Sequence, residues 1–103
     1  MSESVLIVDE IASEREELAR ALEAEGFKAV QSDSPASAVR DIWENQFLVV
    51  FIASVLSDAN PENLAQQLRQ MAPEIETIIH SKSDNRSRLV RKAVEIRDGD
   101  VAA

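Results

Sequence analysis

Residues 5–8 read VLIV and residues 48–53 read LVVFIA, and these two apolar runs decide the fold. A strand that is covered on one face alternates apolar and polar side chains, whereas a strand buried on both faces of a parallel sheet is apolar throughout. Neither run alternates. We therefore predict that both runs are strands of a parallel β-sheet.

The segment between these runs predicts a helix and a second strand. Ser13 followed by Glu16 is a capping-box pair, and Gly26 can end the helix because glycine readily adopts a positive φ. We predict a helix over about residues 13–25 and a strand over residues 27–31.

Three further helices are predicted from N-cap residues, which accept a hydrogen bond from the first helical turn. These residues are Ser34, Asn60, and either Asp84 or Asn85. Pro35 and Pro61 follow two of them at the favoured first helical position, and Gly99 can end the last helix. Residues 77–80 predict a fourth strand. This alternation predicts an α/β open sheet with helices on both faces.

Length and composition exclude several classes of protein. The 103 residues suit one domain, since domains cluster at about 100 to 150 residues, so we expect a single domain over residues 1–103 and no two-domain enzyme. The net charge of −8 opposes binding to nucleic acid. With no cysteine and one histidine, a metal ion could be held only through carboxylates. No apolar run approaches the ~20 residues of a membrane helix, so we expect a cytoplasmic protein without a membrane partner.

Ligands of open parallel sheets bind beyond the carboxyl ends of the strands, and polar residues gather there. Three of the predicted strands have such residues at or just after their carboxyl ends, namely Asp9–Glu10, Ala53–Ser54 and Ser81–Lys82. About residues 4–98 resemble the receiver domain of bacterial response regulators. The resemblance rests on these residue pairs and on the segments VLIVDE, EGF, FLVVFIASVLS and PEIETIIHS. The resemblance implies a CheY-like, flavodoxin-like sheet. We expect the strand order 2-1-3-4, with the fifth strand and helix missing or incomplete.

Receiver domains accept a phosphoryl group on an aspartate that follows strand three, next to magnesium held by an acidic pair. The resemblance places Asp9 and Glu10 at the acidic pair, Ala53 at the phosphoacceptor position and Ser81 at the position of a phosphoryl-binding hydroxyl. Ser57 replaces the usual proline, Lys82 replaces a small residue, and the lysine that follows strand five is missing. A methyl group cannot accept a phosphoryl group, so the resemblance implies a degenerate receiver.

Our leading hypothesis is therefore a bacterial signalling module that is not an enzyme, works without phosphorylation and acts through protein–protein interaction or dimerisation. Its expected partners are a second copy of itself and an unidentified signalling protein, with no cofactor. One alternative is a magnesium-dependent phosphoacceptor domain with an unconventional acceptor, in which Asp9, Glu10 and Ser81 form the site. The other is a fragment of a longer response regulator.

The missing strand and helix predict where an interface would lie. Strand four would become an edge of the sheet, and one face would be uncovered beside the first helix. We therefore expect the interface to include Ile78 and Ile79 on the strand and Leu89, Ala93 and Ile96 on the last helix.

Two ring side chains have ordinary structural interpretations. Trp43 shares a helical stripe with Val39, which predicts packing in the core. His80 is the only histidine and is expected to be partly buried with its hydrogen bonds satisfied. Ser54 and Asp58 are poor substitute acceptors, because the acceptor must lie within bonding distance of the metal. Ser54 should also point away from the side of Ala53, since neighbouring residues of a strand face opposite ways.

Overall fold

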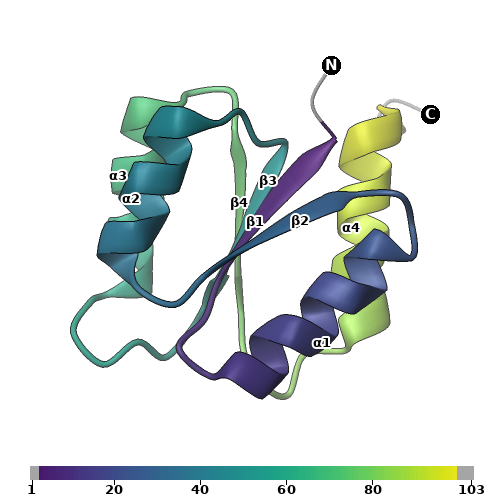
Figure 1. Cartoon of the computed structure of the whole chain (residues 1–103), viewed down its shortest axis with the longest axis horizontal. Coiled ribbons are helices and arrows are strands. Elements are labelled where there is room, and N and C mark those ends of the chain that lie inside the picture. The colour runs from purple at the N-terminus through teal and green to yellow at the C-terminus, as the bar shows by residue number, and fades with distance from the viewer. Residues whose placement is uncertain (1–2, 100–103) are drawn as a thin grey trace.

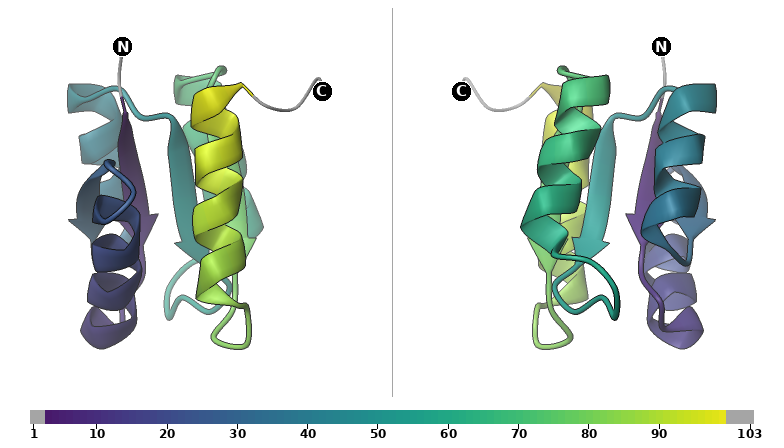
Figure 2. Two further views of the ribbon diagram at one scale, coloured as in Figure 1. Left: turned by 90° about the vertical axis from the view of Figure 1, so that its right-hand side faces the viewer. Right: turned by 90° about the vertical axis from the view of Figure 1, so that its left-hand side faces the viewer.

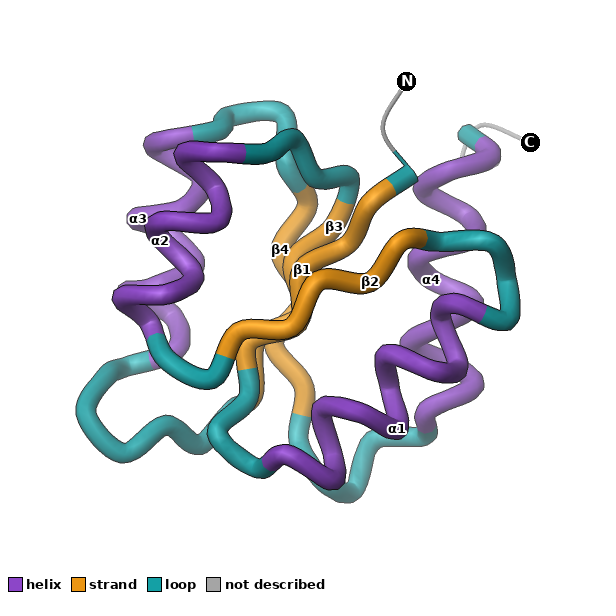
Figure 3. Tube along the Cα trace, in the orientation of Figure 1, coloured by secondary structure: helices purple, strands orange, loops and turns teal. Residues whose placement is uncertain are grey.

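The structure is a computed structural model that describes residues 3–99. Strands and helices alternate along the chain, with the bounds β1 (Ser4–Val8), α1 (Ala12–Glu23), β2 (Lys28–Ser32), α2 (Pro35–Glu44), β3 (Val49–Ala53), α3 (Pro61–Met71), β4 (Glu76–His80) and α4 (Arg86–Asp98). The strands pair in parallel in the order β2-β1-β3-β4, which confirms the predicted order (Figure 3).

Helices cover both faces of this sheet. α1 and α4 lie on one face and α2 and α3 on the other, so the molecule has three layers (Figure 1). Val5 and Ile7 of β1 pack into the core on the α1 side, whereas Leu6 and Val8 pack into the core on the α2 side. All four side chains are fully buried, which confirms that β1 is a strand covered on both faces.

The predicted helix starts are confirmed for α2, α3 and α4. The side-chain oxygens of Ser34, Asn60 and Asn85 each accept hydrogen bonds from backbone N–H groups of the first turn. Gly99 follows α4 with a φ of 68°, as expected for a glycine that ends a helix. These signals depend on a few neighbouring residues, so the sequence located the caps of α2 and α3 and narrowed that of α4 to two residues, of which the structure selects Asn85.

The predicted capping box of α1 is wrong. α1 begins at Ala12 with Ile11 as its N-cap residue, and no side chain caps it. Instead, Oδ1 of Asp9 accepts a hydrogen bond from the N–H of Ile11 at 2.9 Å, which closes the turn just before the helix. Ser13 consequently lies inside the first helical turn, too late to serve as the N-cap.

The last helix corrects our expectation of an uncovered sheet face. α4 lies beside α1 on the same face of the sheet, as the left view of Figure 2 shows. Ala93 is fully buried in this contact, and Leu89, Ile96 and Ile78 are half-buried and pack against the same core. Ala93 therefore faces the interior of its own chain and is not available to a partner.

Two apolar side chains remain open to solvent on other surfaces. Ile79 lies on β4, which pairs only with β3 among residues 3–99, and its exposed fraction is 39%. Trp43 is 78% exposed, which overturns the prediction that it packs in the core. No helix within residues 3–99 is long and apolar enough to cross a membrane.

Candidate functional site

The loops that follow β1, β3 and β4 surround a cavity of about 340 Å³ at the carboxyl ends of these strands. It is lined by Asp9, Glu10, Ile11, Glu14, Ala53, Ser54, Val55, His80, Ser81 and Lys82. The predicted site residues Asp9, Glu10, Ala53 and Ser81 therefore do come together. They meet because all strands of a parallel sheet end at the same edge.

Asp9 holds the backbone of its own loop. Its side chain is buried, and Oδ1 accepts a hydrogen bond from the N–H of Ile11 at 2.9 Å. The guanidinium of Arg15 donates to the backbone oxygen of Asp9 at 2.8 Å. These contacts fix the passage from β1 into α1.

Glu10 joins two loops that are distant in sequence. Its carboxylate accepts hydrogen bonds from the N–H of Ser57 at 2.9 Å and from the Ser57 hydroxyl at 2.7 Å. The hydroxyl and then the N–H of Ser57 lower the pKa of Glu10 below its ordinary value of 4.5. Sequence reasoning missed this pair, although a serine at a position where the resemblance implies proline was a usable signal. Proline has no N–H to donate.

The residues of the cavity do not fit the magnesium site that the resemblance implies. Ala53 ends β3 with a buried methyl group, which offers no oxygen ligand and no phosphoryl acceptor. Both oxygens of Glu10 already accept hydrogen bonds from Ser57. Within residues 3–99, no three carboxylate or histidine side chains are grouped so that they could hold a metal ion.

Ser81, at the predicted hydroxyl position, is tied to its own loop. Its N–H donates to Oδ2 of Asp84 at 2.7 Å, and its hydroxyl is 2.8 Å from the hydroxyl of Ser83. Ser54 also lines the cavity, and its N–H donates to the backbone oxygen of His80 at 2.7 Å. Asp58 is exposed and is not among the residues that line the cavity.

His80 differs from the satisfied side chain that we expected. Its ring is buried, lies edge-on to Phe51 with the ring centroids 6.2 Å apart, and has no hydrogen-bond partner at Nε2 in the part of the chain that the structure describes. Burial lowers the pKa of His80 below 6.5, against the opposing effect of Asp9, Asp84 and Glu14. Burial therefore favours the neutral form of the imidazole.

Comparison with known proteins gives structural matches only. No protein-family model matches the chain, and no curated protein matches its sequence. A CheY-like receiver domain protein from Methanospirillum hungatei JF-1 superposes with a TM-score of 0.86 at 15% identity, over 100% of both chains. A two-component response regulator from Clostridium difficile gives a TM-score of 0.82 at 17% identity, over 99% of this chain and 100% of that one.

A third structure is the response regulator TrrA of Thermotoga maritima in complex with Mg²⁺-BeF. Its TM-score is 0.72 at 21% identity, and the match covers 90% of this chain and 81% of that one. The sheet order, the helices on both faces and these superpositions agree, so the chain has the fold of the CheY-like response regulator receiver domains.

Proposed function

We propose that this protein is a receiver-like signalling module that works without phosphorylation and is not an enzyme. One observation carries the proposal: Ala53 occupies the end of β3, inside the cavity where a phosphoacceptor would be needed. The Glu10–Ser57 hydrogen bonds add to it, because they hold two loops of the cavity together without a ligand. The module would then present a constant surface to its partners.

The test is exposure to a small phosphodonor. We expect the intact mass to stay unchanged after incubation with acetyl phosphate and magnesium. We also expect the amide spectrum to stay unchanged with beryllium fluoride and magnesium, for which TrrA of Thermotoga maritima serves as a positive control. A stable gain of one phosphoryl group would contradict the proposal and support the alternative of an unconventional acceptor.

We further propose that the module forms a homodimer through β4. Within residues 3–99, β4 has a strand neighbour on one side only, so its outer backbone groups are open to pairing. Ile79 is partly exposed at this edge, next to the half-buried Ile78. A second copy of the strand is the simplest partner, since two-fold symmetry pairs an edge with itself.

Sedimentation tests the dimer. We expect Ile79→Lys to give folded monomers, because a charged side chain at an edge strand opposes pairing. Val55→Lys is the matched control, because Val55 is 79% exposed but lies in the loop after β3. An unmutated chain that sediments as a folded monomer at high micromolar concentration would refute the dimer and leave the first proposal intact.

A further inference from the structure

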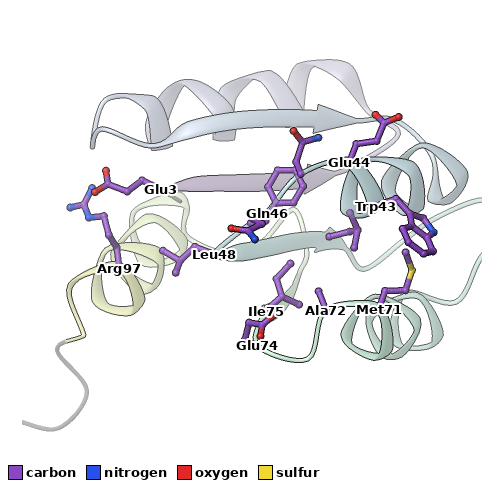
Figure 4. A pocket seen from close by; sticks show the side chains of 13 residues that line it. Glu3, Trp43, Glu44, Gln46, Leu48, Met71, Ala72, Glu74, Ile75 and Arg97 are labelled. Carbon is purple, nitrogen blue, oxygen red and sulfur yellow. The ribbon is translucent and has the colours of Figure 1, made fainter. Parts of the chain in front are cut away.

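A second and larger cavity lies at the opposite end of the sheet. Its volume is about 880 Å³, and it is lined from the carboxyl ends of α2 and α3 and from the loops that lead into β3 and β4. Trp43 and Met71 lie side by side at one end of this groove, and Glu3 and Arg97 lie at the other (Figure 4). The residues of the first cavity take no part in it.

Trp43 is the unusual feature of the groove. It has the largest side chain of α2 and is 78% exposed, whereas Ala38 and Ile42 on the same helix are buried. Tryptophan is enriched among the residues that contribute most to binding at protein interfaces. The face of an indole also attracts cations more strongly than the face of any other side-chain ring.

The surroundings of Trp43 are negatively charged. Glu44 and Glu74 line the groove, and neither carboxylate forms an ion pair or hydrogen bond with another residue in the described part of the chain. Two helices, α2 and α3, end here, so the negative ends of their dipoles point toward the groove. α2 carries no basic residue in its last turn.

The pKa of the nearby Asp41 also reflects the negative charge of Glu44 at the end of α2. Burial first, and then the charge of Glu44, raise the pKa of Asp41 above its ordinary value of 3.8. Arg40 opposes this effect only in part. Burial is the larger cause, and the contribution of Glu44 is the part that reports negative charge at this end of α2.

Arg97, the one basic residue among residues 3–99 that lines the groove, already has other contacts. Its guanidinium donates to the backbone oxygen of Glu25 at 2.6 Å and to Asp98 at 3.1 Å, and it lies 4.6 Å from the centre of the Phe27 ring. It therefore lies at the far end of the groove from Trp43. Arg69, in the last turn of α3, donates to the Thr77 hydroxyl at 2.6 Å and does not line the groove.

We propose that this groove binds a cationic, partly apolar segment of a partner protein. A guanidinium or ammonium group would lie over the Trp43 ring, and further bases of the segment would pair with Glu44 and Glu74, which line the same groove. Apolar side chains of the segment would enter between Ile42, Met71 and Ile75. This surface lies at the opposite end of the sheet from the degenerate receiver site, so it does not depend on the proposals made above.

Fluorescence of the protein itself can report the binding. Trp43 is the only tryptophan and the chain has no tyrosine, so emission excited at long wavelength comes from the groove alone. The probe is an eight-residue peptide of alternating arginine and leucine, capped at both ends. We expect a saturable blue shift of the emission, and none with the peptide in which glutamate replaces arginine.

Matched charge reversals separate this groove from general attraction to an acidic protein. Glu44→Lys with Glu74→Lys should weaken peptide binding by at least about tenfold, because both uncompensated charges are inverted. Glu23→Lys with Glu95→Lys changes the net charge equally at exposed positions of α1 and α4, and we expect less than about a twofold effect. Equal weakening by the two double variants would overturn the proposal.

A labelled peptide provides a readout that does not require the tryptophan. Its anisotropy should rise with the unmutated protein and stay low with Trp43→Ala, which should fold because Trp43 is exposed. Unchanged binding by that variant would overturn the proposal. A blue shift that grows with protein concentration in the absence of peptide would overturn it too, because the groove would then be filled by a second copy.

Discussion

Hydrogen bonds between Ser57 and Glu10 join the loop that follows β3 to the loop that follows β1. Both the N–H and the hydroxyl of Ser57 donate to the Glu10 carboxylate, across 47 positions of sequence. A folded-state pKa below the ordinary value means that Glu10 stabilises the fold above pH 4.5. This contribution is lost as the pH falls through the lowered pKa.

We predict that Ser57→Ala raises the pKa of Glu10 toward its ordinary value, because the hydroxyl is the largest cause of the lowered pKa. Ser57→Pro should raise it further, since proline also removes the N–H. A pH titration of the Glu10 side-chain carbon by NMR measures both shifts. Ser54→Ala is the control and should leave this pKa unchanged. The same pKa in all four proteins would show that the contact does not persist in solution.

His80 predicts a different pH dependence. In the unfolded chain the imidazole takes up a proton near its ordinary pKa of 6.5, whereas the buried ring takes it up only at lower pH. Between these values the unfolded chain binds more protons, so the free energy of unfolding should fall as the pH is lowered below about 6.5. Above this pH the contribution of His80 is constant.

Urea unfolding at several pH values tests this behaviour. His80→Leu should flatten the pH dependence below about 6.5, and the difference between the two curves isolates His80 from the carboxyl groups. At pH 7.5 the variant should be at least as stable as the parent, because a buried nitrogen without a partner is replaced by an apolar group. Parallel curves for parent and variant would contradict the prediction.

At the scale of elements, α4 shows what local patterns can and cannot predict. Its apolar stripe and the N-cap Asn85 were recognisable in the sequence, because helical spacing and capping involve only near neighbours. The face of the sheet that α4 covers was not predictable. The rule of right-handed crossovers needs a parallel strand after the helix, and none follows α4 within residues 3–99.

The position of α4 leads to a prediction for Ala93, which is fully buried beside α1. Ala93→Asp places a charge without a partner in this contact and should destabilise the fold by about 3 kcal/mol or more. Lys92→Asp, at the neighbouring exposed position, should change the stability by less than about 1 kcal/mol. Circular dichroism and sedimentation measure the outcome. A folded, monomeric Ala93→Asp protein would mean that Ala93 lies at a surface between subunits.

Helical geometry also explains why Trp43 was placed wrongly from the sequence. Ala38 and Ile42 are four positions apart and face the core together. Trp43 follows Ile42 directly, and each residue turns an α-helix by about 100°, so its side chain leaves the buried stripe. Val39 lies between these directions and is half-buried. The sequence analysis placed Trp43 on one stripe with Val39, whereas in the structure the buried stripe runs through Ala38 and Ile42, because that side of the helix faces the sheet.

At the scale of the whole molecule, the sheet order accounts for the part of the site that could be predicted. Asp9, Ala53 and Ser81 meet because β1, β3 and β4 are adjacent and parallel. The link between Glu10 and Ser57 could not be predicted, since it depends on how the loop after β3 approaches the loop after β1. The arrangement of strands was thus predictable from patterns, but the pairing of loop side chains was not.

This arrangement predicts that Ala53→Asp alone will not restore a phosphorylation switch. The new carboxylate would join Asp9, Glu10 and Glu14 around one cavity, at a position that is 8% exposed, so like charges would oppose its ionised form. The Ser57 hydrogen bonds would still occupy both carboxylate oxygens of Glu10.

The measurement compares amide spectra and sedimentation of Ala53→Asp with and without acetyl phosphate and magnesium, and we expect no difference in either. Ala53→Asn, which has the same shape without the charge, is the matched control. It should be the more stable of the two at neutral pH, because only the aspartate adds to the negative charge of the cavity. A spectral or oligomeric change that depends on the phosphodonor in Ala53→Asp, and not in Ala53→Asn, would contradict the prediction. It would mean that the absence of a carboxylate at position 53 is the only feature that prevents phosphorylation in this cavity.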